Sequence, residues 1–394
     1  MVLGAKPDFA DLAGQYGVEF APLGNPFKPL MTDGAKNIES GNHIKIFLYM
    51  YRRRKQIAEN FLEDAYRAAA GSDAIIYKYT WSAGYILAEK LNIPCAAVMF
   101  FPITPTVEFP CFTIGKGKDR GRLLNALFMH IGGLYYSWRY QHADIEKFRR
   151  ERLGLKPMSY IGSYRRMIND KMPVFYAYSP YVLPKPSDWP ERMHVTGIWP
   201  SPPPPGWKPP AELTAFLDSG PAPVYIGFGS MTSDADRTLE LVLEALEIAG
   251  KRGVILSGWS GIGDGVKELP ETVYCADEIF HHWLFPKMAA VVHHGGAGTT
   301  ASGLASGVPS IITPFTLDQF SWGGRVRALG AGPEPIPFKD LTASRLAAAI
   351  AEATTDTAMR KRAREIGEIL KREDGLHNTI KLFVDYCENE RNGK

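Results

Sequence analysis

The sequence predicts an α/β protein made of two halves, each built on a parallel sheet. Short apolar runs suited to buried strands alternate with amphipathic helical patterns, as where a strand over 95–100 follows a helix over 82–91. A proline-rich stretch, residues 200–210, divides the chain, because prolines at this density exclude a helix or a central strand. With 394 residues the chain is long enough for two domains.

The proline-rich stretch sets the expected domain boundaries. We expect a first domain over 1–199, a linker over 200–210 and a second domain over 211–375. A closing helix is expected over 376–394, where apolar residues recur on one helical face.

Composition limits the class of protein. Hydrophobic residues make up 45% and charged residues 22% of the chain, as in ordinary globular proteins. The four cysteines (Cys95, Cys111, Cys275, Cys387) show neither pairing nor metal-ligand spacing, which favours a reducing compartment and argues against structural zinc. The longest apolar stretches, such as 95–101, are far too short to span a bilayer. We therefore expect a cytoplasmic protein, at most resting on a membrane surface, with no metal.

Charge is unevenly distributed. Residues 1–199 carry 26 Lys and Arg against 18 Asp and Glu, a balance of +8, whereas residues 200–394 carry 19 against 24, a balance of −5. A basic half fits nucleic acid, an anionic membrane or no charged partner at all. The basic runs 52–55 and 149–152 lie in helical patterns with an apolar opposite face, which favours solvated helix surfaces. No nucleic-acid module is visible, and no nucleic-acid partner is predicted.

The first half opens with short elements. Strands are predicted over 1–4, 18–23 and 74–77, with a helix near 7–16 and a long amphipathic helix over 45–70. A doubly wound domain normally opens on a full strand, turn and helix. We therefore expect that a strand and helix are missing before Met1.

Two apolar segments of the first half leave alternatives open. Residues 100–112, at the carboxyl end of a predicted strand, are either a wall of an apolar pocket or a loop packed into its own domain. Residues 123–138 form a helix pair or one long helix containing Gly132 and Gly133. This segment is apolar on more than one face, so it packs in the core, roofs a hydrophobic cavity or contacts lipid.

The clearest motif is a glycine turn in the second half. An apolar strand over 289–292 leads into His293 and His294, and the glycines of 295–298 precede Thr299 and Thr300 at a helix start. The unpaired amides of such a start and its positive dipole end bind anions, and glycines let oxygens approach closely. The imidazoles and hydroxyls suit a diphosphate, although such a junction is also ordinary turn chemistry.

A dinucleotide-binding fingerprint is a rival interpretation of this turn. Residues 296–301 fit the pattern G-x-G-x-x-G/A, and Asp318 lies about twenty residues further on, as a ribose-binding acid should. Position argues against it, because fewer than about a hundred residues remain for the other strands and helices of such a domain.

Other strand ends of the second half should converge with this turn, because turns after parallel strands fall on one edge of a sheet. The set suits a nucleoside diphosphate sugar: a flat ring for a base or ribose, an apolar edge for a base, an anion site and two sugar-hydroxyl partners. In chain order its residues are Gly229, Ser230, Trp259, Ile279, His294, Gly296, Gly298, Thr299, Asp318 and Gln319.

These residues carry a resemblance to a known family. Residues 292–300 together with 314–323 resemble the donor site of family 1 glycosyltransferases, and residues 281–286 and 227–231 are similar to its sterol and lipid glucosyltransferase branch. The likeness covers residues 220–330 and is diffuse over 1–199.

The resemblance implies a GT-B fold, in which two Rossmann-like domains with parallel sheets face one another across a cleft. The second domain would bind a UDP-sugar, the first a lipophilic acceptor, and the closing helix would cross back to the first domain. The resemblance assigns His294 and Thr299 to the diphosphate, Ser230 to the phosphates or ribose, Ile279 to uracil, and the pair Asp318 and Gln319 to the hexose. UDP-glucose or a related UDP-hexose is then a co-substrate, and no cofactor or metal is expected.

The implied activity is inverting transfer of a hexose, glucose first, to a hydroxyl of a sterol, terpenoid or polyketide. Such transfer needs a general base, which in the family follows the first strand, upstream of Met1. No catalytic residue is assigned; His43, His130 and His142 have no specific signal. The alternative is a catalytically impaired UDP-sugar binder, either a truncated product or a partner subunit.

Overall fold

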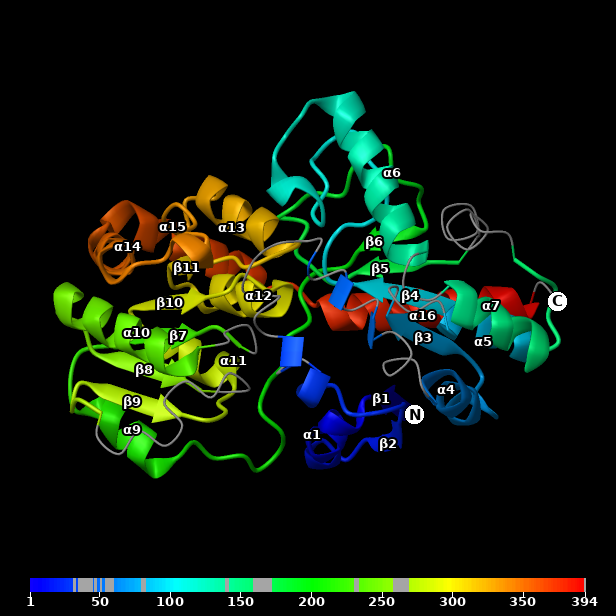
Figure 1. The fold of residues 1–394 in the computed structure, drawn as a ribbon, viewed down its shortest axis with the longest axis horizontal. Helices are drawn as coiled ribbons and strands as arrows, with labels where there is room; N and C mark the ends of the chain where they lie inside the picture. Colours follow the sequence, from blue (N-terminus) through cyan, green and yellow to red (C-terminus); the bar gives the residue numbers. More distant parts are fainter. Residues whose placement is uncertain are drawn as a thin grey trace.

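A computed structural model describes residues 1–30, 60–78, 83–138, 142–158, 172–229, 234–257 and 269–392, with isolated positions between 33 and 53. The chain forms two lobes, one from each half of the sequence, that lie side by side (Figure 1). Each lobe has its own parallel sheet with helices packed on it. The two-halved α/β architecture predicted from the sequence is confirmed.

The first lobe holds a four-stranded sheet in the order β3-β4-β5-β6, with every neighbouring pair parallel. Its strands are β3 (Ile75–Lys78), β4 (Cys95–Met99), β5 (Val174–Tyr176) and β6 (Met193–Val195). The central strands β4 and β5 are buried throughout, as parallel strands covered on both faces are. A separate two-stranded parallel sheet is formed by β1 (Val2–Ala5) and β2 (Glu19–Pro22).

The second lobe holds a five-stranded parallel sheet in the order β11-β10-β7-β8-β9. Its strands are β7 (Val224–Gly227), β8 (Gly253–Leu256), β9 (Val273–Ala276), β10 (Ala290–His293) and β11 (Ser310–Ile312). The chain builds outward from β7 to β9, then returns to place β10 on the other side of β7. This reversal is a topological switch point, where open α/β sheets bind ligands.

The helices cover the sheets of both lobes. In the first lobe they are η1 (Pro7–Phe9), α1 (Ala10–Gln15), α4 (Phe61–Ala69), α5 (Ala83–Leu91), η2 (Gly115–Gly117), α6 (Arg122–Trp138) and α7 (His142–Glu151). In the second they are α9 (Ala211–Asp218), α10 (Ala235–Ala249), α11 (His281–Leu284), η4 (Phe285–Lys287), α12 (Ala297–Ser306), α13 (Gln319–Ala328), η5 (Phe338–Asp340), α14 (Ala343–Thr355) and α15 (Thr357–Leu370). A last helix, α16 (Gly375–Asn392), follows them in the chain.

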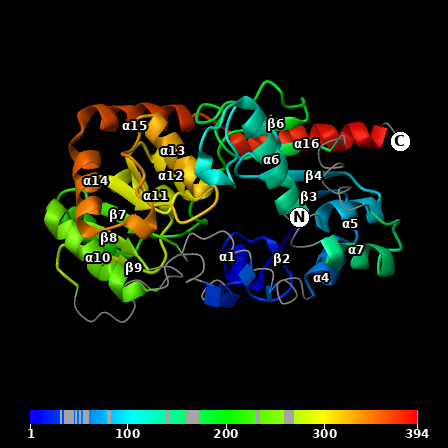
Figure 2. The same ribbon diagram turned by 45° about the horizontal axis from the view of Figure 1, so that its top comes forward.

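The final helix, α16, lies against the first lobe (Figure 2). The hydroxyl of Thr379 bonds that of Thr196 at 2.9 Å and accepts from the indole of Trp199 at 3.2 Å. Gly375 touches the backbone of Gly197 so closely that any side chain would collide with it. The chain therefore crosses from the second lobe back to the first.

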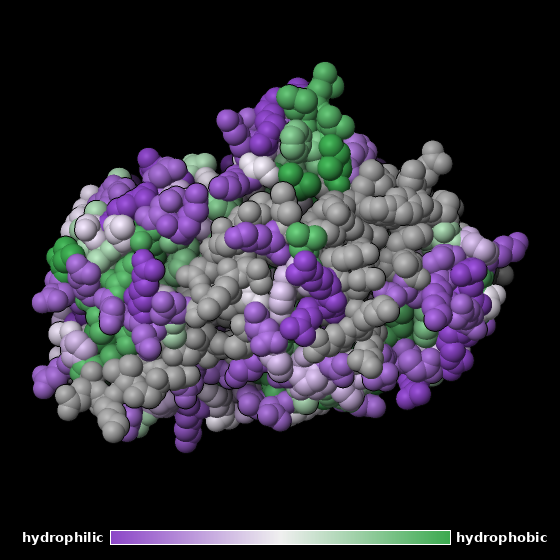
Figure 3. Space-filling view, in the orientation of Figure 1, coloured by the Kyte–Doolittle hydropathy of each residue, from purple (hydrophilic) through white to green (hydrophobic). Residues whose placement is uncertain are grey.

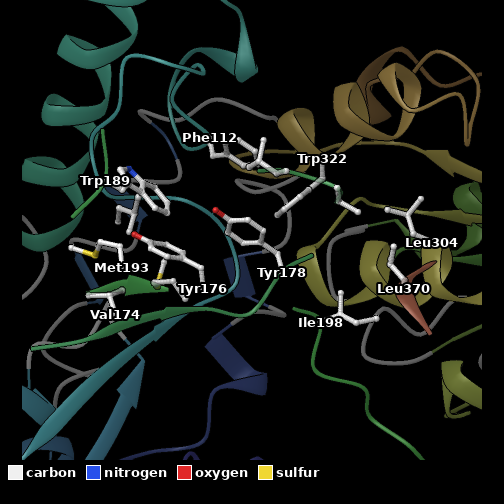
Figure 4. Packing of buried hydrophobic residues seen from close by; sticks show 14 of the residues in the cluster. Phe112, Val174, Tyr176, Tyr178, Trp189, Met193, Ile198, Leu304, Trp322 and Leu370 are labelled. Atoms are coloured by element: carbon white, nitrogen blue, oxygen red, sulfur yellow. The ribbon is translucent and has the colours of Figure 1, made fainter. Parts of the chain in front are cut away.

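One hydrophobic core runs through the junction of the lobes (Figure 4). Phe112 of the first lobe meets Trp322 of α13 edge to face, with ring centroids 5.1 Å apart. Tyr178, just beyond β5, lies 5.9 Å from Trp322. Because aromatic contacts cross the junction, the lobes pack as one body on this side.

The structure bears on three expectations for the first half. The predicted helix over 45–70 is described at its end, as α4, and most of its earlier part lies outside the described residues. The segment 123–138 is one helix, α6, and not a pair; several of its leucines face solvent, so core packing accounts for one face alone. The basic run at 149–152 is not wholly solvated, because Arg149 is buried.

Arg149 is buried because its partners surround the guanidinium. Its terminal nitrogens donate to both carboxylate oxygens of Glu89 at 2.7 Å, and its Nε donates to the carbonyl of Lys156 at 2.7 Å. This bidentate pair joins α7 to α5. Such a fork satisfies the charge that burial would otherwise make costly.

We predict that Arg149→Ala lowers the free energy of unfolding by about 3 kcal/mol, because Glu89 loses its partner and a buried volume empties. The matched control is Arg150→Ala, since Arg150 is 53% exposed and lies 3.9 Å from Glu146. The control should cost about 1 kcal/mol or less. Urea denaturation of both variants measures the difference, and equal losses would contradict the structural role given to Arg149.

Candidate functional site

The switch point brings two strand ends together. Strand β10 pairs with β7 so that His293 lies opposite Gly227. The next residues along each strand then approach one another: a methyl group built on Gly229 would lie 3.6 Å from the His294 ring. The glycine turn and the end of β7 therefore form one site, as the sequence predicts for Gly229 and His294.

The glycine turn is too crowded for side chains. Gly295 has φ of +86°, and a Cβ there would lie 2.6 Å from Ile312 and 3.1 Å from the carbonyl of Gln319. A Cβ on Gly296 would lie 2.5 Å from Nε2 of His294. The turn is thus pressed between β11, α13 and the imidazole of His294.

The start of α12 has the opposite property. Gly296 is the N-cap residue and provides no side chain, so the first amides of the helix have no side-chain cap. Gly298 is exposed, and a Cβ there would meet no atom within 4 Å. Thr299 beside it is half-buried. Open space at an uncapped helix start is what an anion requires.

Of the two adjacent histidines and the two adjacent threonines, one of each kind is buried and the other is partly exposed. His293 is fully buried, and its Nδ1 accepts from the amide of Gly295 at 3.1 Å. Thr300 is 2% exposed and lies inside the lobe. The expectation that both imidazoles and both hydroxyls surround the anion is therefore wrong, and His294 and Thr299 remain beside the helix start.

His294 is held as a neutral ring. Burial lowers the pKa of His294 to about 4, so the imidazole is uncharged at neutral pH. Within the described part of the chain its buried Nδ1 has no hydrogen-bond partner. A buried polar atom without a partner is costly, and a bound ligand that bonded it would remove that cost.

Asp318 and Gln319 follow β11 at the start of α13. The Oε1 atom of Gln319 accepts from the amides of Phe315 at 2.8 Å and Thr316 at 3.0 Å, which fixes the loop. Leu317 inside this loop has φ of +54°, a conformation costly for a branched side chain. The oxygen of the Gln319 side chain is therefore occupied by two backbone amides.

The side chain of Asp318 does not cap its own helix. It is the N-cap residue of α13, yet its side chain makes no capping hydrogen bond. Burial raises the pKa of this carboxyl to about 6, while the charge of Lys78 lowers it in part. Lys78 is the last residue of β3, so this electrostatic interaction joins the carboxyl end of the first sheet to the second lobe.

The sequence did not predict that Lys78 belongs to this site. It gives no local signal for Lys78, because its neighbour Asp318 lies in the other lobe.

Other polar atoms near Asp318 in the sequence are buried without a hydrogen-bond partner in the described structure: Thr316 Oγ1 and Ser321 Oγ. The hydroxyl of Tyr178, across the junction, is a third. Thr316 and Ser321 lie within three residues of Asp318 in the sequence, and the ring of Tyr178 contacts Trp322 of α13.

The remaining predicted residues are less fully placed. Ile279 is 7% exposed and packs beside Tyr225 and Phe285, at the carboxyl side of β9. Ser230 and Trp259 lie outside the described residues. The roles predicted for all three stay predictions.

Residues 100–112 follow mainly the second of their two alternatives. Ile103, Cys111 and Phe112 are buried in the core of the first lobe. Phe109 contacts both Phe112 and Trp189. The segment is thus packed into its own lobe, except that Phe112 also reaches Trp322 across the junction.

Comparison with solved structures defines the fold. The chain superposes on glycosyltransferase VinC in complex with DTDP with a TM-score of 0.62 at 18% identity, over 98% of this chain and 92% of that one. The glycotransferase of kitacinnamycin gives 0.66 at 19% identity, over 99% and 91%. The fold is of the GT-B type, with two Rossmann-like domains, as the sequence predicts.

Sequence comparison confirms the resemblance to family 1 glycosyltransferases and to their sterol branch. Residues 250–372 match the family model of the Erythromycin biosynthesis protein CIII-like, C-terminal domain. A sterol 3-beta-glucosyltransferase of Arabidopsis thaliana is 34% identical over 97% of this chain and 62% of that protein. One of Cryptococcus neoformans var. neoformans is 34% identical over 82% of this chain and 22% of its own length.

The chain thus spans about three fifths of the plant relative and less of the fungal one. These matches favour a glycosyltransferase donor site over the dinucleotide fingerprint at 296–301. In the described residues one strand alone, β11, follows β10, which is too few for the rest of a dinucleotide-binding domain.

The described residues hold no group of three or more His, Cys, Asp or Glu that could bind a metal ion. No helix among them is long and apolar enough to cross a membrane.

We predict that Gly298→Ala leaves stability unchanged or slightly higher, because the methyl meets no protein atom and alanine favours a helix. The same methyl occupies the space where phosphate oxygens would approach the helix start. UDP affinity should therefore fall about ten-fold. Calorimetric titration with UDP measures this, with Gly14→Ala in α1 as control, where a methyl also meets nothing. Unchanged affinity would show that the anion lies elsewhere.

Proposed function

We propose that the protein transfers glucose from UDP-glucose to a hydroxyl group of a sterol or a similarly lipophilic alcohol, with inversion at the anomeric carbon. The observation that carries the proposal is the switch-point site, where the turn at Gly295 and Gly296 contacts both His294 and the first residue of α13, next to the open start of α12. The sterol 3-beta-glucosyltransferase names of the Arabidopsis and Cryptococcus relatives support the donor and acceptor classes. They give no support to the alternative of an impaired UDP-sugar binder.

The second lobe would bind the donor in order along the sheet edge. The edge near Ile279 would receive uracil, and His294 with Thr299 and the α12 amides would hold the diphosphate. Neutral His294 serves as a hydrogen-bond donor, while the helix dipole provides the positive potential. As the bond between the anomeric carbon and the phosphate oxygen breaks, negative charge grows on UDP, and these groups stabilise it.

Asp318 would orient the hexose. A carboxylate accepts hydrogen bonds from two sugar hydroxyls, and the NH2 group of Gln319 donates to a third. The buried hydroxyls of Thr316 and Ser321, within three residues of Asp318 in the sequence, have no hydrogen-bond partner among the described residues. The acceptor would lie on the side of the first lobe, with its hydroxyl directed at the anomeric carbon.

We predict that His294→Ala weakens UDP binding by about 1–3 kcal/mol, since the diphosphate loses a donor in a largely buried site. Isothermal calorimetry measures the loss. The control is His377→Ala, because His377 is an exposed histidine of α16. The assignment of the donor site fails if both variants bind UDP like the wild type.

Asp318 gives a pH-dependent prediction. Burial raises its pKa to about 6, so the carboxylate that accepts sugar hydroxyls disappears as the pH falls through 6. We expect kcat/KM for UDP-glucose, and UDP-glucose affinity, to decline below this pH, because the phosphates of UDP-glucose keep their charge there and Asp318 does not. The stability of the fold changes with pH in the opposite direction. Because burial raises the pKa of Asp318 to about 6 in the folded protein, the free energy of unfolding falls as the pH rises through this value.

The control for this prediction is Asp318→Asn, which cannot ionise. Its kcat/KM should be low at every pH and lack the inflection near 6, while it binds UDP like the wild type. Equal losses of UDP and UDP-glucose affinity in this variant would place Asp318 on the nucleotide and not on the sugar.

A further inference from the structure

The outer face of α6 exposes a stripe of large aliphatic side chains. Its members are Leu123, Leu124, Leu127 and Ile131. Leu123 is 84% exposed, and the other three are between 47% and 51% exposed. At 100° per residue these positions fall within one sector of the helix, and Asn125 and Met129 on the opposite side are buried. The side of α6 that carries Asn125 and Met129 packs on the protein, and the stripe faces water.

This stripe is continuous on the molecular surface. Figure 3 shows it as a hydrophobic patch at the top of the molecule, over α6, with hydrophilic residues beside it. Figure 1 shows α6 standing out from the first lobe, so its outer face can reach a flat surface. Contiguous exposed apolar side chains on a folded protein mark an interaction site.

A basic segment leads directly into the stripe. Residues 115–122 hold four cationic side chains and one carboxylate, a balance of +3: Lys116, Lys118, Arg120, Arg122 and Asp119. Lys118 and Arg122 are exposed. The carboxylate of Asp119 accepts from the amide of Gly121 and the side chain of Asn125, both at 2.8 Å, and so shapes the helix start.

We propose that residues 115–131, the docking tip, bind the surface of an anionic lipid bilayer. Aliphatic side chains would enter the boundary between headgroups and acyl chains, and the cations would contact acidic headgroups. Charge selects this occupant. A second protein surface would need the apolar stripe alone, and a polyanion without lipid would need the cations alone, whereas a bilayer uses both at once.

The docking tip also contacts the helix that begins at Asp318. The ammonium group of Lys116 lies 5.1 Å from the ring centroid of Phe320. Gly117 lies so close to Ser321 that an added Cβ would be 2.6 Å from its hydroxyl oxygen. A docked tip would therefore hold the sugar-binding end of α13 near the bilayer, where a lipophilic acceptor is dissolved. This consequence rests on the proposed function, but the docking itself does not.

The test is sedimentation of the full chain with vesicles of phosphatidylcholine, and of phosphatidylcholine with phosphatidylserine. We expect binding to the anionic vesicles. The double variant Leu123→Ser, Leu127→Ser should lower the partition coefficient about ten-fold or more, because each leucine loses the transfer free energy of a buried aliphatic side chain. Lys118→Gln with Arg122→Gln should lower it about five-fold per cation, and added salt should erase that difference.

Matched controls lie on the second lobe. Ile248→Ser removes an aliphatic side chain that is 57% exposed on α10. Arg360→Gln with Lys361→Gln removes two exposed cations of α15. Both controls should bind vesicles like the wild type, and all variants should keep the wild-type affinity for UDP.

The proposal is overturned if the wild type ignores anionic vesicles, or if the leucine variant binds them equally well. It is also overturned if light scattering shows a dimer that the leucine variant dissociates, since the stripe then joins two copies. Vesicle binding by a wild type that fails to bind UDP would instead refute the proposed function and leave the docking tip standing.

Discussion

The turn at Gly295 and Gly296 leaves no room for a side chain, and much of the second lobe depends on that close approach. One glycine is pressed against Ile312 of β11 and the backbone of Gln319, and the other lies under the ring of His294. The turn therefore fixes three things together: the direction of the imidazole, the open start of α12 and the position of the loop before α13. One crowded contact thus determines how the residues of the candidate site are arranged.

Strain beside this contact has a compensating partner. The left-handed conformation of Leu317 costs free energy. The two hydrogen bonds that backbone amides donate to Oε1 of Gln319 offset this cost, because they close the loop around Leu317. Phe315 in the same loop stacks on Phe338, with ring centroids 4.1 Å apart. The loop is thereby held in place, and the side chain of Asp318 makes no capping hydrogen bond. The loop thus gives the carboxylate of Asp318 a rigid support.

Local patterns in the sequence were sufficient for the parts of this fold that depend on neighbours in the chain. The strand predicted over 289–292 is observed as Ala290–His293, and the helix after the glycines begins within the predicted turn. The division between His293 and His294 was not predictable, because it depends on which residue of an alternating strand faces inward at its end. Arg149 was misjudged for a related reason: its partner Glu89 lies 60 residues away. The periodicity of one helix cannot reveal a contact with a residue of another helix.

The junction between the lobes explains why residues important to the site come from both halves. The guanidinium of Arg362 donates to the hydroxyl of Tyr181 at 2.8 Å, and that of Arg325 donates to the carbonyl of Val182. With the aromatic contact of Phe112 and Trp322, these bonds tie α13 and α15 to the loop after β5. Lys78 then acts on the carboxylate of Asp318, and Tyr178 contacts Trp322 of the same helix, although they lie some 240 and 140 residues from Asp318 in the sequence. Because the first lobe contacts α13 at Ser321, Trp322 and Arg325, a change in how the lobes pack would move the helix and the carboxylate of Asp318 together.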